Sequence, residues 1–426
     1  MTGTPRAAED RSLRIQAHNA QWRELCSVTL LAGLDPAVDP AALRAALRRL
    51  YDVDPTAPIL CRVAAGPLRW VPVAPEEIDR RLEELVVDVR GTPKEDLEEL
   101  VERLLREGDP MVPFRLFVHD DHHAWQLSHV LGDGVYANRH VVAELVRCAA
   151  NGDVPAGLVR GPHRPRLLAR AVWRTLLRRP RLTTWRVALD RLRSAPPSTP
   201  PAGDPADRQV ALSVVSRMSG PGMREAVRRW RDEQAADTSV AVSTMAAVRS
   251  ALEVEGAFLP GTDTVVLFDG RRYLPAGTHV AGNFSSALRL TPENSTDPRR
   301  MARQMRRDAA LGLPLVSMLV ATVTHTLSRF RPSAAGGSGS VVLTHLGPLT
   351  ELRELPWQAP PTEQRIIQAP APSAAVSMTA CISEWQDRIV LSVSFDSRRV
   401  PRAAVTRALE RVLDDPRAFL PAGAAG

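Results

Sequence analysis

One histidine, His129, lies at the end of an apolar stretch in a setting that suits proton transfer. It begins the sequence His-Val-Leu-Gly-Asp-Gly, so Asp133 and Gly134 follow closely along the chain. A neutral imidazole accepts a proton near neutral pH when the surrounding backbone fixes its orientation and tautomer. The spacing therefore predicts a general base at His129. A loop histidine followed by a helix-capping aspartate fits the same residues and stays open as the alternative.

The residues around His129 predict a β-hairpin that ends in this loop. Apolar and polar side chains alternate over residues 114–120 and 124–129, with a polar tip between them. His122 and His123 belong to that tip, and we expect both to be solvated. A helix is predicted after the loop, over residues 136–150, because Asn151 and Gly152 then end the apolar periodicity.

The motif resembles the active-site motif of the CoA-dependent acyltransferase superfamily. Its members include condensation domains of nonribosomal peptide synthetases, wax-ester synthases and chloramphenicol acetyltransferases. The family has two adjacent histidines, three variable residues, then Asp-Gly; here Ser128 replaces the first histidine and His129 keeps the second. Softer matches occur in the family's order, namely residues 58–62 with 69–70, 270–275 with 282–286, and 344–349. The resemblance spans residues 17–415.

This resemblance implies a fold of two chloramphenicol-acetyltransferase-like subdomains, arranged in a V around a central tunnel. The residues alone predict α/β layers in each half, because strands and helices are interspersed. We expect an N-terminal subdomain over residues 1–193 that carries the His motif and a C-terminal subdomain over 208–426. Between them, residues 194–207 form a Pro-rich linker whose composition excludes a regular element.

The resemblance also implies an activity, in which an acyl group moves from a CoA or carrier-protein thioester to an amine or alcohol. The product is an amide or an ester, as in natural-product biosynthesis. No bound cofactor is implied, since the acyl-CoA or phosphopantetheine thioester is a co-substrate. Because the first motif histidine is absent, a second reading stays open: a non-catalytic condensation-like domain that docks a carrier protein or a partner enzyme.

Roles for individual residues follow from the same resemblance. Asp133 is expected to hold the loop through a salt bridge to Arg271, with Arg272 as the second candidate. Gly134 allows substrate or backbone to approach closely. The predicted substrate and tunnel residues are Ser128, Asn283 and His345. Asn283 would donate a hydrogen bond to the thioester arm or the oxyanion, although a turn residue after Gly282 explains it equally well.

Composition limits the other classes of function. The chain has 426 residues and four widely spaced cysteines without nearby histidine ligands, so we expect no metal site. No secretory signal or long apolar run is seen, which favours a cytoplasmic protein.

The chain carries a net charge of +7, and one segment is much more basic than the rest. Between Arg160 and Arg193 there are eleven arginines and one acid, Asp190. Apolar residues recur in this segment at helical spacing. Peripheral contact with a membrane, docking of an acidic carrier protein and a simple solvated helix face all remain open. Nucleic acid is not expected, since no binding module accompanies the segment.

The remaining elements are predicted from periodicity and from helix start signals. The chain should form strands at 24–32, 59–62, 68–73, 209–216, 264–268, 341–344, 375–382 and 388–395. It should form helices at 40–50, 93–106, 221–234, 239–254, 297–310 and 401–413. The helix at 93 is placed by Pro93 and the acids behind it.

Overall fold

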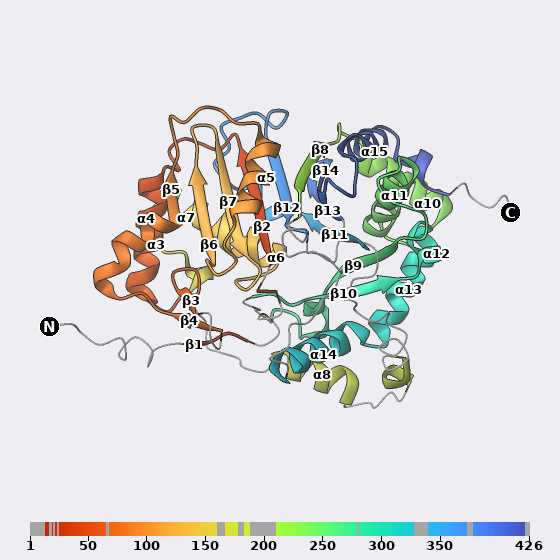
Figure 1. Ribbon diagram of the computed structural model, residues 1–426, viewed down its shortest axis with the longest axis horizontal. Coiled ribbons are helices and arrows are strands. Elements are labelled where there is room, and N and C mark those ends of the chain that lie inside the picture. The colour runs from red at the N-terminus through yellow and green to blue at the C-terminus, as the bar shows by residue number, and fades with distance from the viewer. Residues whose placement is uncertain are drawn as a thin grey trace. The chain divides into compact units, whose positions relative to one another are not determined.

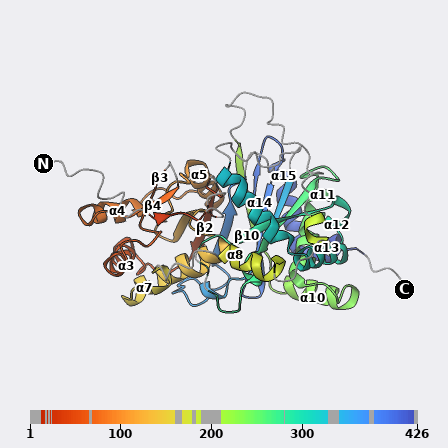
Figure 2. The ribbon, with the colours of Figure 1, turned by 90° about the horizontal axis from the view of Figure 1, so that it is seen from below.

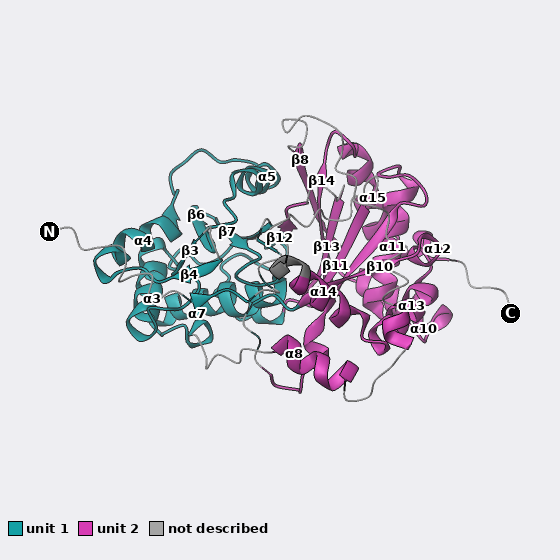
Figure 3. Cartoon of the chain, turned by 60° about the horizontal axis from the view of Figure 1, so that its bottom comes forward, with its two compact units in different colours: residues 1–165, 279–284, 350–368 teal, residues 166–278, 285–349, 369–426 magenta. Residues whose placement is uncertain are grey.

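The computed structural model describes residues 13–16, 19, 22–23, 25–64, 68–159, 167–177, 183–187, 210–278, 280, 282–327, 340–372 and 378–421. The chain divides into two compact units (Figure 3). Unit 1 contains residues 1–165, 279–284 and 350–368, and unit 2 contains residues 166–278, 285–349 and 369–426. Each unit therefore combines segments that are distant in sequence. The sequence instead predicts two contiguous halves. The predicted linker, 194–207, lies outside the described residues.

Unit 1 is built on a mixed sheet with the strand order β12-β2-β7-β6-β5. Its strands are β12 (Arg365–Pro370), β2 (Cys26–Ala32), β7 (His122–Ser128), β6 (Phe114–Val118) and β5 (Val86–Asp88). The hairpin of β6 and β7 is antiparallel, as the alternation predicted, and β5 adds to β6 in parallel (Figure 1). β7 is central and is buried on both faces along its whole length. It is therefore a rigid support for the loop that follows it.

Helices and a small second sheet complete unit 1. The helices are α3 (Pro40–Val53), α4 (Ile78–Leu85), α5 (Leu97–Glu107) and α7 (Ala143–Asn151). The second sheet contains β1 (Leu13–Arg14), β4 (Arg69–Val71) and β3 (Arg62–Ala64). α3 buries Leu43, Leu47 and Leu50 at helical spacing, which places its apolar face inward.

Unit 2 has a six-stranded sheet with the order β10-β9-β11-β13-β14-β8. The strands are β10 (Ser285–Leu290), β9 (Asp263–Asp269), β11 (Ser340–Pro348), β13 (Met378–Trp385), β14 (Arg388–Asp396) and β8 (Leu212–Met218). β11 runs parallel to both of its neighbours, whereas the other pairs are antiparallel. The mixed α/β class is therefore confirmed.

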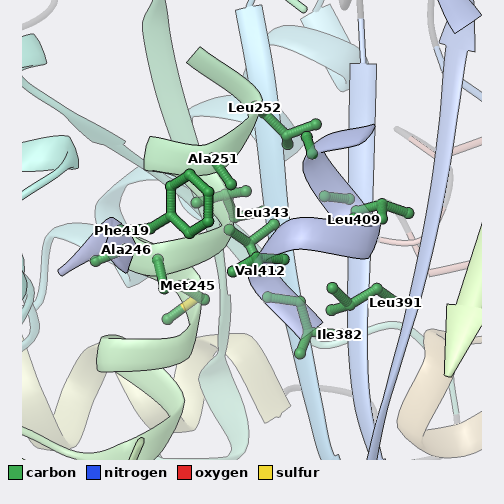
Figure 4. Close-up of a cluster of buried hydrophobic side chains, with 14 of the residues drawn as sticks. Met245, Ala246, Ala251, Leu252, Leu343, Ile382, Leu391, Leu409, Val412 and Phe419 are labelled. Atoms are coloured by element: carbon green, nitrogen blue, oxygen red, sulfur yellow. The ribbon is translucent and has the colours of Figure 1, made fainter. Parts of the chain in front are cut away.

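The core of unit 2 lies between its sheet and the helices α11 (Val240–Val254) and α15 (Arg402–Asp414). Figure 4 shows side chains of both helices meeting those of three strands. Leu343, Ile382 and Leu391 come from β11, β13 and β14, and they are at most 1% exposed. Further helices are α8 (Leu167–Val172), α10 (Met223–Gln234), α13 (Pro298–Ala310) and α14 (Leu313–Leu327).

Several predicted elements differ from the structure. The helix expected from Pro93 begins at Leu97, because Asp96 caps it by accepting from the amides of Glu98 and Glu99. His122 and His123 are only 6% and 4% exposed, so the expectation of solvated side chains was wrong. Both belong to β7, since the strand begins closer to the turn than the alternation indicated. β5, β10, β12, α4 and α14 were not predicted.

The helix expected over 136–150 is present but is not uniform. A short α6 (Gly134–Tyr136) leads into a π-helical stretch, η2 (Ala137–Val142), before α7 begins. The helix ends as predicted, at Gly152, which has a positive φ of 75°. A π-helical turn at this position lies directly behind the His motif, a placement seen often at functional sites.

Candidate functional site

His129 lies at the C-terminal end of β7, and backbone hydrogen bonds hold it there. Its amide donates to the carbonyl of Leu25 at 2.9 Å, just before β2. The next turn is closed by the amide of Leu131, which donates to the carbonyl of Ser128 at 2.9 Å. The backbone of His129 is therefore held by hydrogen bonds at the ends of β2 and β7, and its imidazole projects from a restrained position. Fixed attachment of this kind is what a positioned general base requires.

Ser128, which replaces the first motif histidine, has structural partners. Its hydroxyl donates to the carbonyl of Pro110 at 2.7 Å and accepts from the amide of Val130 at 3.3 Å. The residue is 1% exposed. These bonds anchor the start of the loop. A contact between Ser128 and a substrate stays a prediction.

Asp133 connects the loop to a segment that is distant in sequence. One carboxylate oxygen accepts from the amide of Tyr136 at 3.0 Å and so caps α6. The other accepts from the amide of Phe284 at 3.1 Å. Both bonds use backbone donors, and the side chain is buried. The carboxylate therefore fixes the loop against residues 283–284 of the same unit.

The two glycines of the loop allow its tight closure. A Cβ on Gly132 would lie 2.3 Å from Cδ1 of Tyr136, so no larger residue fits at this position. Gly134 begins α6, immediately after the Asp133 cap. Gly134 was predicted as a site residue, and the structure places it next to Asp133. Its contact with a substrate is untested.

Asn283 is the predicted residue that the structure brings nearest to the His129 ring. Its side-chain amide nitrogen lies 3.5 Å from Nδ1 of His129, at the outer limit of a hydrogen bond. The backbone amide of Asn283 donates to Oδ1 of Asn19 at 3.1 Å. Gly282 has a φ of +106°, and a Cβ there would lie 2.5 Å from Nδ2 of Asn19. Asn19 and Gly282 therefore set the position of Asn283.

Sequence reasoning missed Asn19 and Trp22. The Trp22 ring lies 6.3 Å from the His129 ring, centroid to centroid, at an interplanar angle of 36°. Asn19 is 7% exposed and contacts a segment more than 260 positions away in sequence. No local pattern marks either residue, because each is recognised only through its long-range partner.

The environment of His129 keeps its imidazole neutral. Burial lowers the pKa of His129 below its usual value, and the nearby Asp133 carboxylate opposes that shift only in part. Nε2 is buried and has no hydrogen-bond partner among the residues that the structure describes. In a neutral ring this nitrogen can accept a proton only when the ring proton is on Nδ1.

The predicted residues Arg271 and His345 belong to unit 2. Arg271 lies 3.2 Å from the Asp269 carboxylate, so its salt bridge with Asp133 stays a prediction. On β11, Nδ1 of His345 accepts from the amide of Gly347 at 3.0 Å, and Nε2 lies 3.9 Å from Glu384. Burial lowers the pKa of His345 as well. Its place in a substrate tunnel is likewise untested.

Nucleophilic cysteine chemistry has no support here. Cys26, Cys61, Cys148 and Cys381 are free and buried. Burial raises the pKa of Cys148, the cysteine nearest the motif in sequence, to about 11. Such a thiol stays protonated at neutral pH. In the described part of the chain, no three His, Cys, Asp or Glu side chains are grouped so as to hold a metal ion.

Known structures share this fold across nearly the whole chain, whereas neither a family model nor a curated protein matches the sequence. The trichothecene 15-O-acetyltransferase TRI3 of Fusarium sporotrichioides is 13% identical, with a TM-score of 0.66 over 98% of this chain and 97% of that one. The condensation enzyme VibH is 15% identical, with a TM-score of 0.54 over 95% and 94%. The epimerization domain of tyrocidine synthetase B is 15% identical, with a TM-score of 0.58 over 96% and 97%.

The chain therefore has the fold of condensation domains and CoA-dependent acyltransferases. These three proteins are named for acetyl transfer, condensation and epimerization, so the fold alone does not select the reaction. The choice has to come from the residues around His129.

Proposed function

We propose that this protein is an acyltransferase in which His129 acts as the general base. The donor is an acyl thioester of CoA or of a carrier-protein phosphopantetheine, and the acceptor is a small amine or alcohol. One observation carries the proposal: Nε2 of His129 is buried, unpartnered within the described residues and part of a ring whose pKa is lowered. The four buried free thiols favour a reducing compartment, and we place the enzyme in the cytoplasm.

In the proposed reaction His129 transfers one proton and forms no covalent bond to the acyl group. Nε2 removes the proton from the acceptor O–H or N–H as that atom bonds to the thioester carbonyl carbon. The tetrahedral oxyanion then re-forms its C=O bond and breaks the C–S bond. The imidazolium returns the proton to the departing thiolate, which leaves as a thiol. General-base catalysis of this kind contributes ~10²–10⁴-fold in rate.

The proposal requires a defined tautomer of His129. Nε2 accepts a proton only when the ring proton is on Nδ1. The NH2 group of Asn283 faces Nδ1 in the structure, an orientation that favours a proton on Nε2. The proposal therefore requires the amide to be turned by 180°, so that its oxygen accepts from Nδ1–H. Asn283 is thus proposed as a positioning residue, with Asn19 and Gly282 holding it in place. The sequence predicts a different role for the same side chain, in which the Asn283 amide donates a hydrogen bond to the substrate; this role is the alternative to positioning His129.

A second candidate is a non-catalytic domain of the same fold. The observation that favours it is Ser128, whose hydroxyl anchors the loop at the position of the family's first histidine. In that case His129 would be a buried remnant, and the protein would bind a carrier protein or partner enzyme without turnover.

Thiol release distinguishes the two candidates. The full-length protein is incubated with acyl-CoA and acyl-carrier-protein thioesters, with and without pooled amines and alcohols. His129→Ala runs beside a matched control, His119→Ala, which removes an imidazole from the turn between β6 and β7. Acceptor-dependent release that is lost only in His129→Ala supports the acyltransferase. Release equal in all three proteins, or carrier-protein binding without any release, contradicts it.

A further inference from the structure

The basic segment predicted from sequence contains a helix with two different faces. α8 continues into a π-helical stretch, η4 (Trp173–Leu177), and both belong to unit 2. The inner face buries five apolar side chains: Leu167, Leu168, Ala171, Val172 and Leu176. α8 lies against α14 (Figure 2). The approach is close, since a Cβ on Gly312 would lie 2.7 Å from Cδ2 of Leu176. Packing against α14 therefore accounts for the inner face only.

The outer face combines arginines with exposed apolar groups. Arg170 and Arg174 are four residues apart, as are Trp173 and Leu177, and all four side chains are exposed. Trp173 is 60% exposed and Leu177 is 48% exposed. This spacing places the four side chains along one side of a helix. We call this set the Arg-Trp stripe.

The charge around the Arg-Trp stripe is positive. Arg170 and Arg174 form no ion pair with any residue that the structure describes. The flanking sequence from Arg160 to Arg193 adds nine further arginines and a single acid. Arginines that have no ion-pair partner among the described residues and lie next to an exposed indole are typical of a surface that meets anionic groups.

Two other exposed apolar residues, Val53 and Val254, lie between acidic residues. Val53 is 58% exposed and lies between Asp52 and Asp54 in sequence. Val254 is 64% exposed and lies between Glu253 and Glu255. The sequence neighbours of both sites are therefore acidic rather than basic. The pairing of exposed apolar groups with cations thus distinguishes the Arg-Trp stripe from these sites.

We propose that the Arg-Trp stripe binds the surface of an anionic lipid membrane. Trp173 and Leu177 enter the headgroup region, while Arg170 and Arg174 contact lipid phosphates. The contact is peripheral, and no described helix is long and apolar enough to span a bilayer. This inference does not depend on the proposed acyl transfer. It predicts that the protein associates with a membrane surface whether or not it transfers an acyl group.

Vesicle flotation tests the proposal with the full-length protein. Vesicles of phosphatidylcholine alone are compared with vesicles containing phosphatidylglycerol, at low and high salt. We expect flotation only with the anionic vesicles, weaker at high salt. Arg170→Gln with Arg174→Gln should lower the partition coefficient about 30-fold, since each arginine near such a surface contributes a factor of roughly five. The matched control is Arg228→Gln with Arg229→Gln on α10.

The apolar half of the stripe is tested separately. Trp173→Ser should also weaken flotation, and it should remove a blue shift in tryptophan fluorescence that vesicles cause in the parent protein. Val254→Ser is the matched exposed control and should behave as the parent. Circular dichroism and Tm verify that each variant is folded.

Three outcomes would overturn the inference. The first is the absence of flotation with any vesicle, and the second is flotation that the stripe variants leave unchanged. The third is displacement of the protein from vesicles by a soluble acidic carrier protein that binds the stripe more tightly, which would assign the surface to a protein partner. None of these results bears on whether His129 catalyses acyl transfer.

Discussion

Each unit contains a buried histidine whose pKa is lowered mainly by burial, yet the two rings differ in what they can do. His345 in unit 2 uses Nδ1 to accept the Gly347 amide, so its neutral ring must carry the proton on Nε2. Nε2 of both rings is buried and has no hydrogen-bond partner among the described residues, but Nδ1 of His129 in unit 1 faces a side-chain amide that can either donate or accept. Burial alone does not make a general base. The hydrogen-bond partner of Nδ1 decides whether the ring proton lies on Nδ1, and only then can Nε2 accept a proton.

The largest expected effect is a loss of kcat when His129, but not His345, is replaced. His129→Ala should lower kcat ~10²–10⁴-fold, because it removes the proton acceptor. His345→Gln should leave kcat within a few-fold of the parent, since an Nε2 that already carries a proton cannot act as the base. Initial rates of thiol release measure both. Equal losses in the two variants would remove the distinction drawn above.

The next effect concerns the carboxylate that holds the His129 loop. Asp133→Ala leaves two backbone amides, those of Tyr136 and Phe284, without their acceptor. Each buried donor left unpaired costs about 1–3 kcal/mol in the free energy of unfolding. We therefore expect a lower Tm together with lower activity, and a partial recovery of both in Asp133→Asn. A variant that melts with the parent yet is inactive would assign Asp133 a chemical role instead.

A smaller effect is expected from disturbing Gly282 and Asn19, the residues that hold Asn283 in position. Gly282→Ala forces a side chain into a left-handed backbone conformation and against Asn19. Strain of this type costs about 1–3 kcal/mol. The expected result is a reduced Tm and a reduced kcat with little change in KM. Gly220→Ala is the control, because a Cβ at that position meets nothing within 4 Å. Similar behaviour of the two variants would show that Asn283 needs no such support.

The last prediction is a pH dependence of stability that leaves the protein unaffected at neutral pH, where the other predictions are measured. Burial is the main reason that the pKa of His123 falls to about 4. Below about pH 6.5 the unfolded chain binds a proton that the folded chain refuses until about pH 4, so stability is full above that window and declines through it. His123→Gln should flatten the decline of Tm between pH 6.5 and 4. An unchanged slope would contradict the assignment.

The part of the site that could be predicted is local in sequence. The alternation over residues 114–129 is a property of neighbouring residues, so the hairpin and the position of His129 follow from it. The short range of a capping bond likewise makes Asp133 a recognisable helix start. The mixed α/β class also follows from local patterns, because strand and helix periodicities alternate along both halves.

The rest depends on contacts that no local pattern records. Asn19 meets Asn283 across most of the chain, and Trp22 is identified only by the ring beside it. The burial of His122 and His123 was missed because polar residues beside a turn are usually solvated. Here β7 is covered on both faces, and tertiary packing overrides that preference. Trp173 lies in the segment where apolar residues recur at helical spacing, which does not indicate that its side chain is exposed on the outer face.

The most direct test of the central claim measures where the protons are on the two rings. Protein labelled with ¹⁵N in its histidines is studied by NMR near pH 7, and the signals are assigned with His129→Gln and His345→Gln. The account predicts a neutral His129 with its proton on Nδ1 and a neutral His345 with its proton on Nε2. A His129 that carries its proton on Nε2, as His345 does, would leave no base at the site and would contradict the proposed mechanism.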